Sequence, residues 1–175
     1  MPHIVKIEGF VLKKRILLEQ DILVTVFTQE FGKVTAMAKG ARKITSRRSA
    51  HLQTGNLINL NLSESHDMYY IQSSELISGF MQIKNEKQLN IRYLFFFILD
   101  KLLPERQEEL PLYKLTKHFC VDVSAGTKEP ALILRDTLQK TLQYLGYVQD
   151  QKSLQELLQL AEDNIEEKLP RNVIM

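Results

Sequence analysis

Cysteine is nearly absent from this sequence, in which Cys120 is the only one among 175 residues. One thiol cannot form a disulfide within the chain, and it cannot supply the paired cysteines of a structural zinc site. Cysteine usage this low is typical of a reducing cytoplasm, where we expect the protein to act. The sequence also lacks a phosphate-binding glycine loop, so we expect neither a metal nor an organic cofactor.

Long hydrophobic runs are missing as well. The most apolar stretch is seven residues long, 93–99, whereas a helix that crosses a bilayer needs about 20 residues. The N-terminal MPHIVKIEGF carries a charge at Lys6 and has no long apolar core, which argues against a signal peptide. With 44% hydrophobic and 25% charged residues, the composition indicates a globular protein with no membrane partner.

Acidic residues are absent from one long segment, between Glu30 and Glu64. This segment contains KGARKITSRRS, residues 39–49, which we call the basic loop. The acid-free segment holds six Lys and Arg residues, although the net charge of the whole chain is only +2. A second cationic group, Lys13-Lys14-Arg15, precedes it. Positive charge is therefore concentrated in the N-terminal part of the chain.

The first 80 residues have the pattern of a small β-barrel. Short runs rich in Val, Ile, Leu, Thr, Phe and Tyr are separated by turn residues. Gly32 lies between two such runs and predicts a hairpin turn with a positive φ. Gly9 lies inside the first run and predicts a β-bulge. Five strands in this length favour an OB-fold, and the predicted strands are 3–14, 21–28, 34–38, 56–62 and 68–75.

The pattern changes to helices after residue 78. Prolines open two of the predicted helices, and Leu134, Leu138 and Leu142 recur at helical spacing. Ser153 and Glu156 have the spacing of a capping box. The predicted helices are 83–103, 111–124, 130–145 and 153–169. We therefore expect an α+β protein, with an OB-fold domain in residues 1–78 and a helical domain in residues 79–175.

The basic loop falls between the third and fourth predicted strands. In an OB-fold, a cationic loop beside the sheet follows the phosphate backbone of nucleic acid. The alternative is a solvated loop that keeps a sheet edge from aggregating, as edge lysines do. Solubility alone would not require a single sign of charge, so we favour nucleic-acid binding. The predicted DNA-binding residues are Lys13, Lys14, Arg15, Lys33, Lys39, Arg42, Lys43, Arg47 and Arg48.

Aromatic side chains beside this surface are candidates for stacking on bases. They are Phe31, Tyr69 and Tyr70. Adjacent residues of a strand point to opposite faces, so we expect at most one of the two tyrosines to be exposed. For each aromatic taken singly, packing in the core is the favoured alternative.

One family is recognisable in the order and spacing of three stretches, EGFVLKKR, DILVTVFTQEFGKVTAMAKGARK and SRRSAHLQTG. They cover most of residues 7–76 and resemble the N-terminal domain of RecO, the bacterial DNA repair and recombination mediator. A weaker resemblance, LILRDTLQKTLQYLGY, is to a helix of the same family. The resemblance implies an OB-fold followed by a helical domain, binding of single- and double-stranded DNA, and annealing of complementary strands. It also implies a nucleoid-associated protein of the bacterial cytoplasm.

The same resemblance implies partner proteins. Family members act with RecR, bind the acidic tail of the single-stranded DNA-binding protein SSB, and help to load RecA onto coated DNA. Arg135 matches the family's Leu-Arg position on an amphipathic helix, and a cation beside an apolar groove suits an acidic peptide tail. The alternative is a surface arginine paired with Asp136 or Glu129.

The sequence departs from the family in two places. Many members carry a four-cysteine zinc module after the Leu-Gly-Tyr helix, whereas VQDQKSLQELLQLAEDNI follows Tyr147 here, and the chain is shorter than is usual. We therefore expect a short form without zinc. Residues 16–18, Ile-Leu-Leu, stand where the family commonly has a polar turn that contains glycine.

Two other classes of function stay open at this point. One is an OB-type module that binds RNA or supports assembly. The other is an enzyme that uses scattered titratable groups, such as Glu64, His66 and Asp67, although these read first as a turn between strands. The sequence shows no motif of nucleophilic or metal-dependent catalysis, so we expect no enzymatic activity. Cys120 lies in an apolar stretch and is predicted to be inert.

Overall fold

The computed structural model describes residues 3–41, 48–79 and 85–170. The chain divides into two compact units. The barrel unit comprises Met1–Phe80 and Leu103–Leu110, and the helical unit comprises Met81–Leu102 and Pro111–Met175. The segment Leu103–Leu110 thus belongs to the barrel unit although it follows a helix of the other unit in the sequence.

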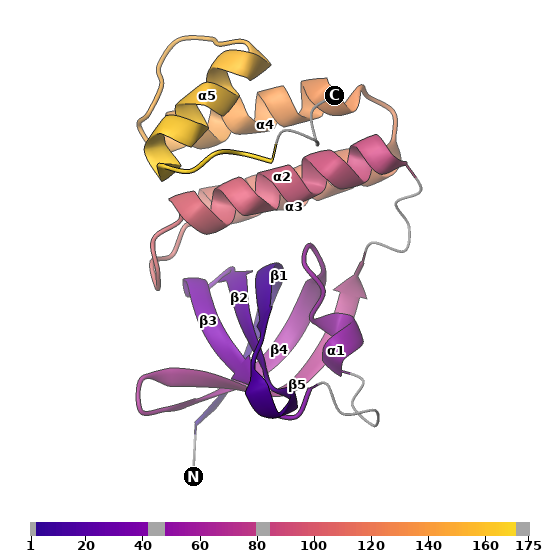
Figure 1. Ribbon diagram of the computed structural model, residues 1–175, viewed down its shortest axis with the longest axis vertical. Helices are drawn as coiled ribbons and strands as arrows, with labels where there is room; N and C mark the ends of the chain where they lie inside the picture. The colour runs from indigo at the N-terminus through magenta and orange to yellow at the C-terminus, as the bar shows by residue number, and fades with distance from the viewer. Residues whose placement is uncertain (1–2, 42–47, 80–84, 171–175) are drawn as a thin grey trace. The chain divides into compact units, whose positions relative to one another are not determined.

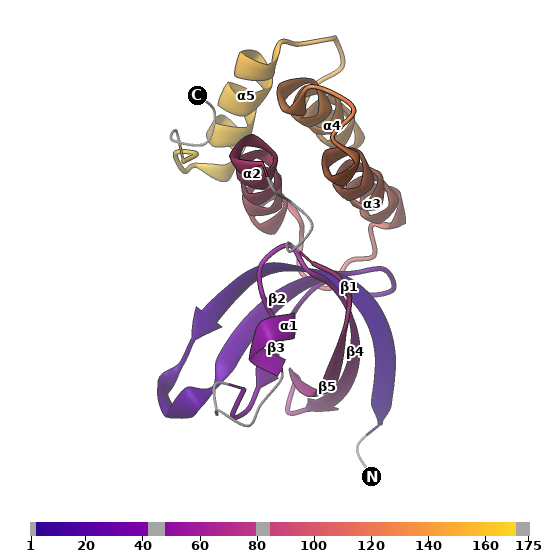
Figure 2. The ribbon, with the colours of Figure 1, turned by 90° about the vertical axis from the view of Figure 1, so that its right-hand side faces the viewer.

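Five strands in the described residues close a barrel in the order β1-β2-β3-β5-β4 (Figures 1 and 2). Neighbouring strands are antiparallel except β3 and β5, which are parallel. This is the strand order of an OB-fold, so the predicted fold class is confirmed. The strands are β1 (Ile4–Ile16), β2 (Ile22–Thr28), β3 (Gly32–Ala38), β4 (Leu57–Ser65) and β5 (Met68–Ser78).

Strand β1 closes the barrel because it pairs with two partners. Its first half pairs with β4 and its second half with β2, and Gly9 and Phe10 pair with both. The bulge predicted at Gly9 is wrong: the register between β1 and β2 shifts at Leu12, between Val11 and Lys13. Gly9 is needed for close approach instead, since a Cβ there would lie 2.5 Å from Val26 Cγ1 and 2.9 Å from the Phe27 carbonyl oxygen.

Alternating side chains of the strands fill the barrel. In β4, Ile58, Leu60 and Leu62 are buried, which is the inward face that the alternation in LINLNL predicts. Small residues of β3, Ala36 and Ala38, lie in the same core. This core is made of aliphatic side chains, and it holds the surface loops on a rigid base.

The turn between β2 and β3 has the positive φ predicted at Gly32, which is +65°. The segment Leu103–Leu110 packs against this turn. The backbone N–H of Arg106 donates to the Lys33 carbonyl at 2.8 Å, and a Cβ on Gly32 would collide with the backbone of Gln107. Glycine is required here by backbone angle and by space together.

Four helices make up the described part of the helical unit: α2 (Glu86–Leu102), α3 (Leu110–Ala125), α4 (Pro130–Tyr144) and α5 (Leu154–Ile165). Their predicted positions are confirmed within a few residues, except that α5 ends earlier than expected. Phe95 of α2 packs on Phe119 of α3 with ring centroids 4.5 Å apart. Helix α4 buries Leu134, Leu138 and Leu142, and contacts α2 and α5.

The predicted capping box of α5 is present. The Ser153 hydroxyl accepts from the Glu156 N–H, and the Glu156 carboxylate accepts from the Ser153 N–H.

Two short helices of the barrel unit have no signal in the hydrophobic pattern: η1 (Leu18–Gln20) and α1 (Arg48–His51). Among the helices of the described residues, none combines the length and the apolar character that crossing a bilayer requires.

Replacement of Gly32 by alanine tests the contact between the turn and the segment Leu103–Leu110. Gly146 is a matched control, because its φ is +82° but a Cβ there would meet nothing within 4 Å. Gly146→Ala should cost about 1–2 kcal/mol of local stability from the backbone alone. Gly32→Ala should cost clearly more, because the collision with Gln107 adds to the same strain. Amide hydrogen exchange of peptides from each unit measures the loss of local stability in the two variants. Equal losses of stability would contradict the packing of Gln107 on Gly32.

Candidate nucleic-acid interface

The end of β1 presents two exposed cations. Lys13 and Arg15 alternate with Lys14, which is half-buried, because neighbouring residues of a strand face opposite sides. The Lys14 ammonium donates to Gln53 Oε1 at 2.6 Å, and burial lowers the pKa of Lys14 from its ordinary value. Lys13 and Arg15 are therefore placed for phosphate contact, whereas Lys14 holds the residues that follow α1.

The start of the basic loop is fixed beside the same hairpin. The Gly40 N–H donates to the Asp21 carboxylate at 2.7 Å, and Asp21 directly precedes β2. Lys39 is exposed, and its ammonium lies 5.0 Å from the centroid of the Tyr70 ring. Three other predicted DNA-binding residues, Arg42, Lys43 and Arg47, lie outside the described residues.

Arg48 connects the two ends of the basic loop. Its guanidinium donates to the Lys39 carbonyl at 2.6 Å and to the Ile71 carbonyl of β5 at 3.0 Å. Next to it, His51 Nδ1 lies 3.1 Å from the Ser74 carbonyl and holds α1 on β5. The planar fork of an arginine suits such divided donation. Arg48 is placed to position the loop as well as to add charge.

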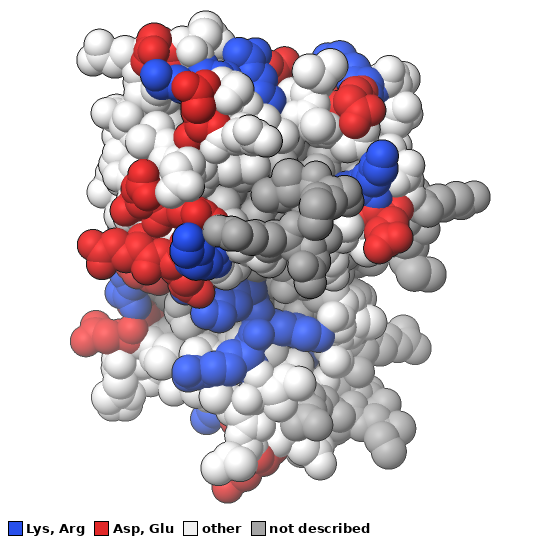
Figure 3. All heavy atoms as spheres, turned by 45° about the horizontal axis from the view of Figure 1, so that its top comes forward, with Lys and Arg blue, Asp and Glu red and all other residues white. Residues whose placement is uncertain are grey.

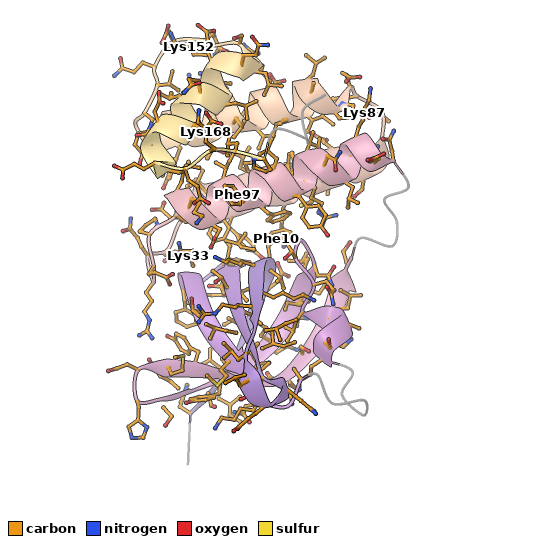
Figure 4. The ribbon with its side chains drawn as sticks, in the orientation of Figure 1. Phe10, Lys33, Lys87, Phe97, Lys152 and Lys168 are labelled. Atoms are coloured by element: carbon orange, nitrogen blue, oxygen red, sulfur yellow. The ribbon has the colours of Figure 1, made fainter. Side chains whose placement is uncertain are left out.

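Lys33 does not share this exposed surface. Its residue is 9% exposed, and its ammonium lies 3.8 Å from the Glu105 carboxylate. Figure 4 shows Lys33 at the start of β3. A buried, paired ammonium cannot meet a phosphate without breaking the ion pair, so the geometry does not favour the role predicted for Lys33.

The three candidate stacking aromatics have different surroundings. Phe31 is 37% exposed. Tyr69 and Tyr70 are both half-buried, and Tyr69 packs against the barrel core. The Arg106 guanidinium lies 4.8 Å from the Tyr69 ring centroid, and Lys39 faces Tyr70. A cation thus faces each tyrosine ring, which leaves Phe31 as the most accessible of the three.

A pocket of about 640 Å³ opens between the start of β1 and the turn of β4 and β5. Phe31 and Tyr69 line it together with Glu64, His66 and Asp67. Arg106 donates to Glu64 Oε1 at 3.4 Å and to the Asp67 carbonyl at 2.6 Å. The carboxylates make this pocket a poor phosphate site, so it is separate in character from the cationic surface.

Arg135 of α4 is engaged in three hydrogen bonds. It donates to the Lys152 carbonyl at 3.1 Å, to Asp136 Oδ1 at 3.0 Å and to Gln151 Oε1 at 3.1 Å. The pairing with Asp136 that the alternative interpretation of Arg135 predicts is thus present. The same bonds tie α4 to the segment before α5, and the side chain keeps 32% of its surface exposed.

Within residues 3–41, 48–79 and 85–170, no three His, Cys, Asp or Glu side chains are grouped to hold a metal ion. Burial raises the pKa of Cys120 to about 11, although nearby Arg92 acts in the opposite direction. The thiol therefore stays protonated at neutral pH and is a weak nucleophile.

Charge is distributed differently over the two units. Figure 3 shows Lys and Arg side chains next to one another on the face of the barrel turned to the viewer. Elsewhere in the same view, acidic side chains gather in one group at the left, and acidic and basic side chains are interspersed in other places. Adjoining cations without acids between them raise the local positive potential, as binding of a polyanion requires.

Comparison with known proteins identifies the family. A family model described as "Recombination protein O N terminal" matches residues 1–80. A "DNA repair protein RecO" of Caldanaerobacter subterraneus subsp. tengcongensis is 31% identical over 144 residues, which cover 82% of this chain and 58% of the relative. Proteins of the same name from Thermoanaerobacter sp. and Listeria monocytogenes serotype 4b are each 30% identical, over 83% and 81% of this chain and 59% and 55% of the relatives.

The chain thus spans between 55% and 59% of the length of these curated relatives. The family model covers all five strands of the barrel, and the alignments with the relatives extend over more than 140 residues, so they also reach the helical unit. The strand order of the barrel and the position of the basic loop agree with the sequence resemblance noted above. The chain belongs to the RecO family.

Proposed function

We propose that this chain is a DNA-binding protein of recombinational DNA repair that binds single- and double-stranded DNA and anneals complementary strands. The observation that carries the proposal is the group of exposed cations Lys13, Arg15 and Lys39, beside a basic loop whose ends are held by Asp21 and Arg48. The names of the relatives, DNA repair protein RecO, support the biological setting.

Annealing follows from charge neutralisation. Two strands repel each other through their phosphates, and a protein that screens the phosphates without reading base edges leaves the bases free to pair. Lys13, Arg15, Lys39 and the rest of the basic loop supply that screening. The chemistry needs no bond to be broken, so the protein acts without enzymatic activity.

The partners belong to the same proposal. With RecR, the protein helps to load RecA onto DNA coated by SSB, in the bacterial cytoplasm at the nucleoid. Arg135 is the candidate contact for the acidic tail of SSB. Its remaining exposed surface and its position on α4 suit a carboxylate, while its bonds to Lys152 and Gln151 hold the side chain in place.

Salt dependence tests the phosphate contacts. Each contact contributes a slope of about −0.9 to log K against log salt, so removal of two should flatten the slope by roughly 2 units. Lys13→Ala with Arg15→Ala should have this effect equally on unrelated sequences. Lys87→Ala with Lys140→Ala is the matched control, since both lysines are exposed on the helical unit. Fluorescence anisotropy at several salt concentrations measures the slopes, and equal slopes for the two double variants would exclude the β1 cations.

Annealing should need neither metal nor nucleotide. We expect the protein to anneal complementary bare strands at the same rate in EDTA and without ATP, because charge neutralisation is the only step. The Lys13→Ala, Arg15→Ala variant should anneal more slowly at a fixed protein concentration. A stopped-flow assay with a donor and an acceptor dye on the two strands measures the rate. Loss of annealing in EDTA would point to a metal-dependent reaction and contradict the proposal.

The division of labour between the units is tested at Arg135. Arg135→Ala should leave annealing of bare strands intact and impair annealing of SSB-coated strands. The variant loses the cation proposed to bind the SSB tail but keeps the cations of the barrel. Gln151→Ala is the control, since it removes one hydrogen bond of Arg135 but keeps its charge. A loss shared by both variants would assign Arg135 to folding, and equal loss on bare and coated DNA would place it in DNA contact.

A further inference from the structure

Two apolar side chains project from the turn between β1 and β2. Leu18 is 90% exposed and Ile16 is 55% exposed. We call residues 16–18 the apolar tip. Burying a leucine side chain contributes about 1.5–3 kcal/mol to folding. Leu18 is too exposed to contribute this stabilisation to the barrel unit. Exposed apolar groups that are contiguous are typical of a contact surface.

The backbone of the turn is held in an unfavourable conformation. Glu19 and Gln20 have φ of 60° and 67°, a region that costs a residue other than glycine roughly 1–2 kcal/mol. The Leu17 N–H donates to the Asp21 carbonyl at 2.9 Å and closes the turn. Such strain is concentrated at functional sites, where the surrounding structure fixes it.

The apolar tip directly follows two exposed cations in the chain. Lys13 and Arg15 are on the same strand as Ile16, and both are exposed. The carboxylate of Asp21, at the other end of the turn, holds Gly40 of the basic loop. Glu19, which directly follows the tip, is an exposed acid, and these cations outnumber it. The occupant of this surface must therefore offer an apolar face between negative charges.

Stacked bases between phosphates have this chemistry. We propose that the apolar tip enters the base stack of bound DNA, with Leu18 inserted between two bases and Ile16 beside it, while Lys13 and Arg15 hold the flanking phosphates. Apolar wedges of this kind partly unstack a base step, and the loop between the first two strands of an OB-fold is one of its nucleic-acid contacts. The inference rests on the proposed function and adds a contact that acts on the bases themselves.

An anionic membrane is the other surface that attracts cations with apolar groups. Interfacial binding, however, scales with the apolar area that is buried, and it is typically achieved by a long amphipathic helix. The tip offers only Ile16 and Leu18 as exposed apolar side chains. An anionic membrane therefore fits the tip less well than DNA does.

The test uses short DNA duplexes that carry 2-aminopurine, a base whose fluorescence rises when it is unstacked. Saturating wild-type protein should raise the fluorescence. The double variant Ile16→Ser, Leu18→Ser should lose the rise while its affinity stays within about threefold, because phosphate contacts supply most of the binding free energy. Ile4→Ser is the matched control, since Ile4 is 56% exposed at the opposite end of β1, and it should keep the rise. Circular dichroism confirms that the variants are folded, and Leu18→Ala alone should already reduce the rise.

Three results would overturn the inference. The first is bound wild-type protein that gives no rise at any 2-aminopurine position, and the second is a rise that persists in the double variant. The third is binding of wild-type protein to DNA-free vesicles of anionic lipid that the double variant loses, together with an unchanged 2-aminopurine signal. Failure of wild-type protein to bind DNA at all would instead overturn the proposed function, and the inference with it.

Discussion

Repulsion between like charges is the constraint around which the barrel surface is organised. A loop that concentrates lysine and arginine without acids costs free energy in a compact structure, since each cation lies in the field of the others. The chain meets this cost at the two ends of the loop. Asp21 accepts from the Gly40 N–H, and Arg48 donates to the Lys39 carbonyl and to Ile71 of β5. These bonds anchor the loop on strands whose aliphatic core is independent of the charge.

The anchors also connect the basic loop to β1. Because β1 pairs with β4 and then with β2, its second half carries Lys13 and Arg15 to the turn that ends at Asp21. The β1–β2 hairpin thus supplies the exposed cations Lys13 and Arg15, the apolar tip, and the acid that fixes the basic loop. The register shift at Leu12 lies just before this cationic stretch. A β-bulge commonly changes the direction of the side chains that follow it, and this one directly precedes Lys13.

Sequence patterns predicted the parts of the fold that depend on hydrophobic period and on turn chemistry. The alternation in β4, the positive φ of Gly32 and the capping box of Ser153 all follow from local rules, and all are present. The bulge could not be placed at Leu12 from sequence, because close packing of Gly9 on Val26 also requires glycine and mimics the signal of a bulge. The burial of Lys33 could not be predicted from sequence either, because its ion-pair partner Glu105 is distant in sequence.

The candidate site shows the same division between local and distant information. A run of cations is visible in the sequence, but the task of each cation is not. Arg48, Arg106 and Arg135 each donate to a main-chain carbonyl of a segment remote in sequence, because a guanidinium can serve several acceptors at fixed angles. Lys13 and Lys39 remain exposed on the barrel. A count of basic residues therefore overstates the exposed positive charge. Among the described residues, Lys13, Lys39 and Arg15 are the better measure of the proposed DNA-binding surface, and Arg48 helps to fix its position.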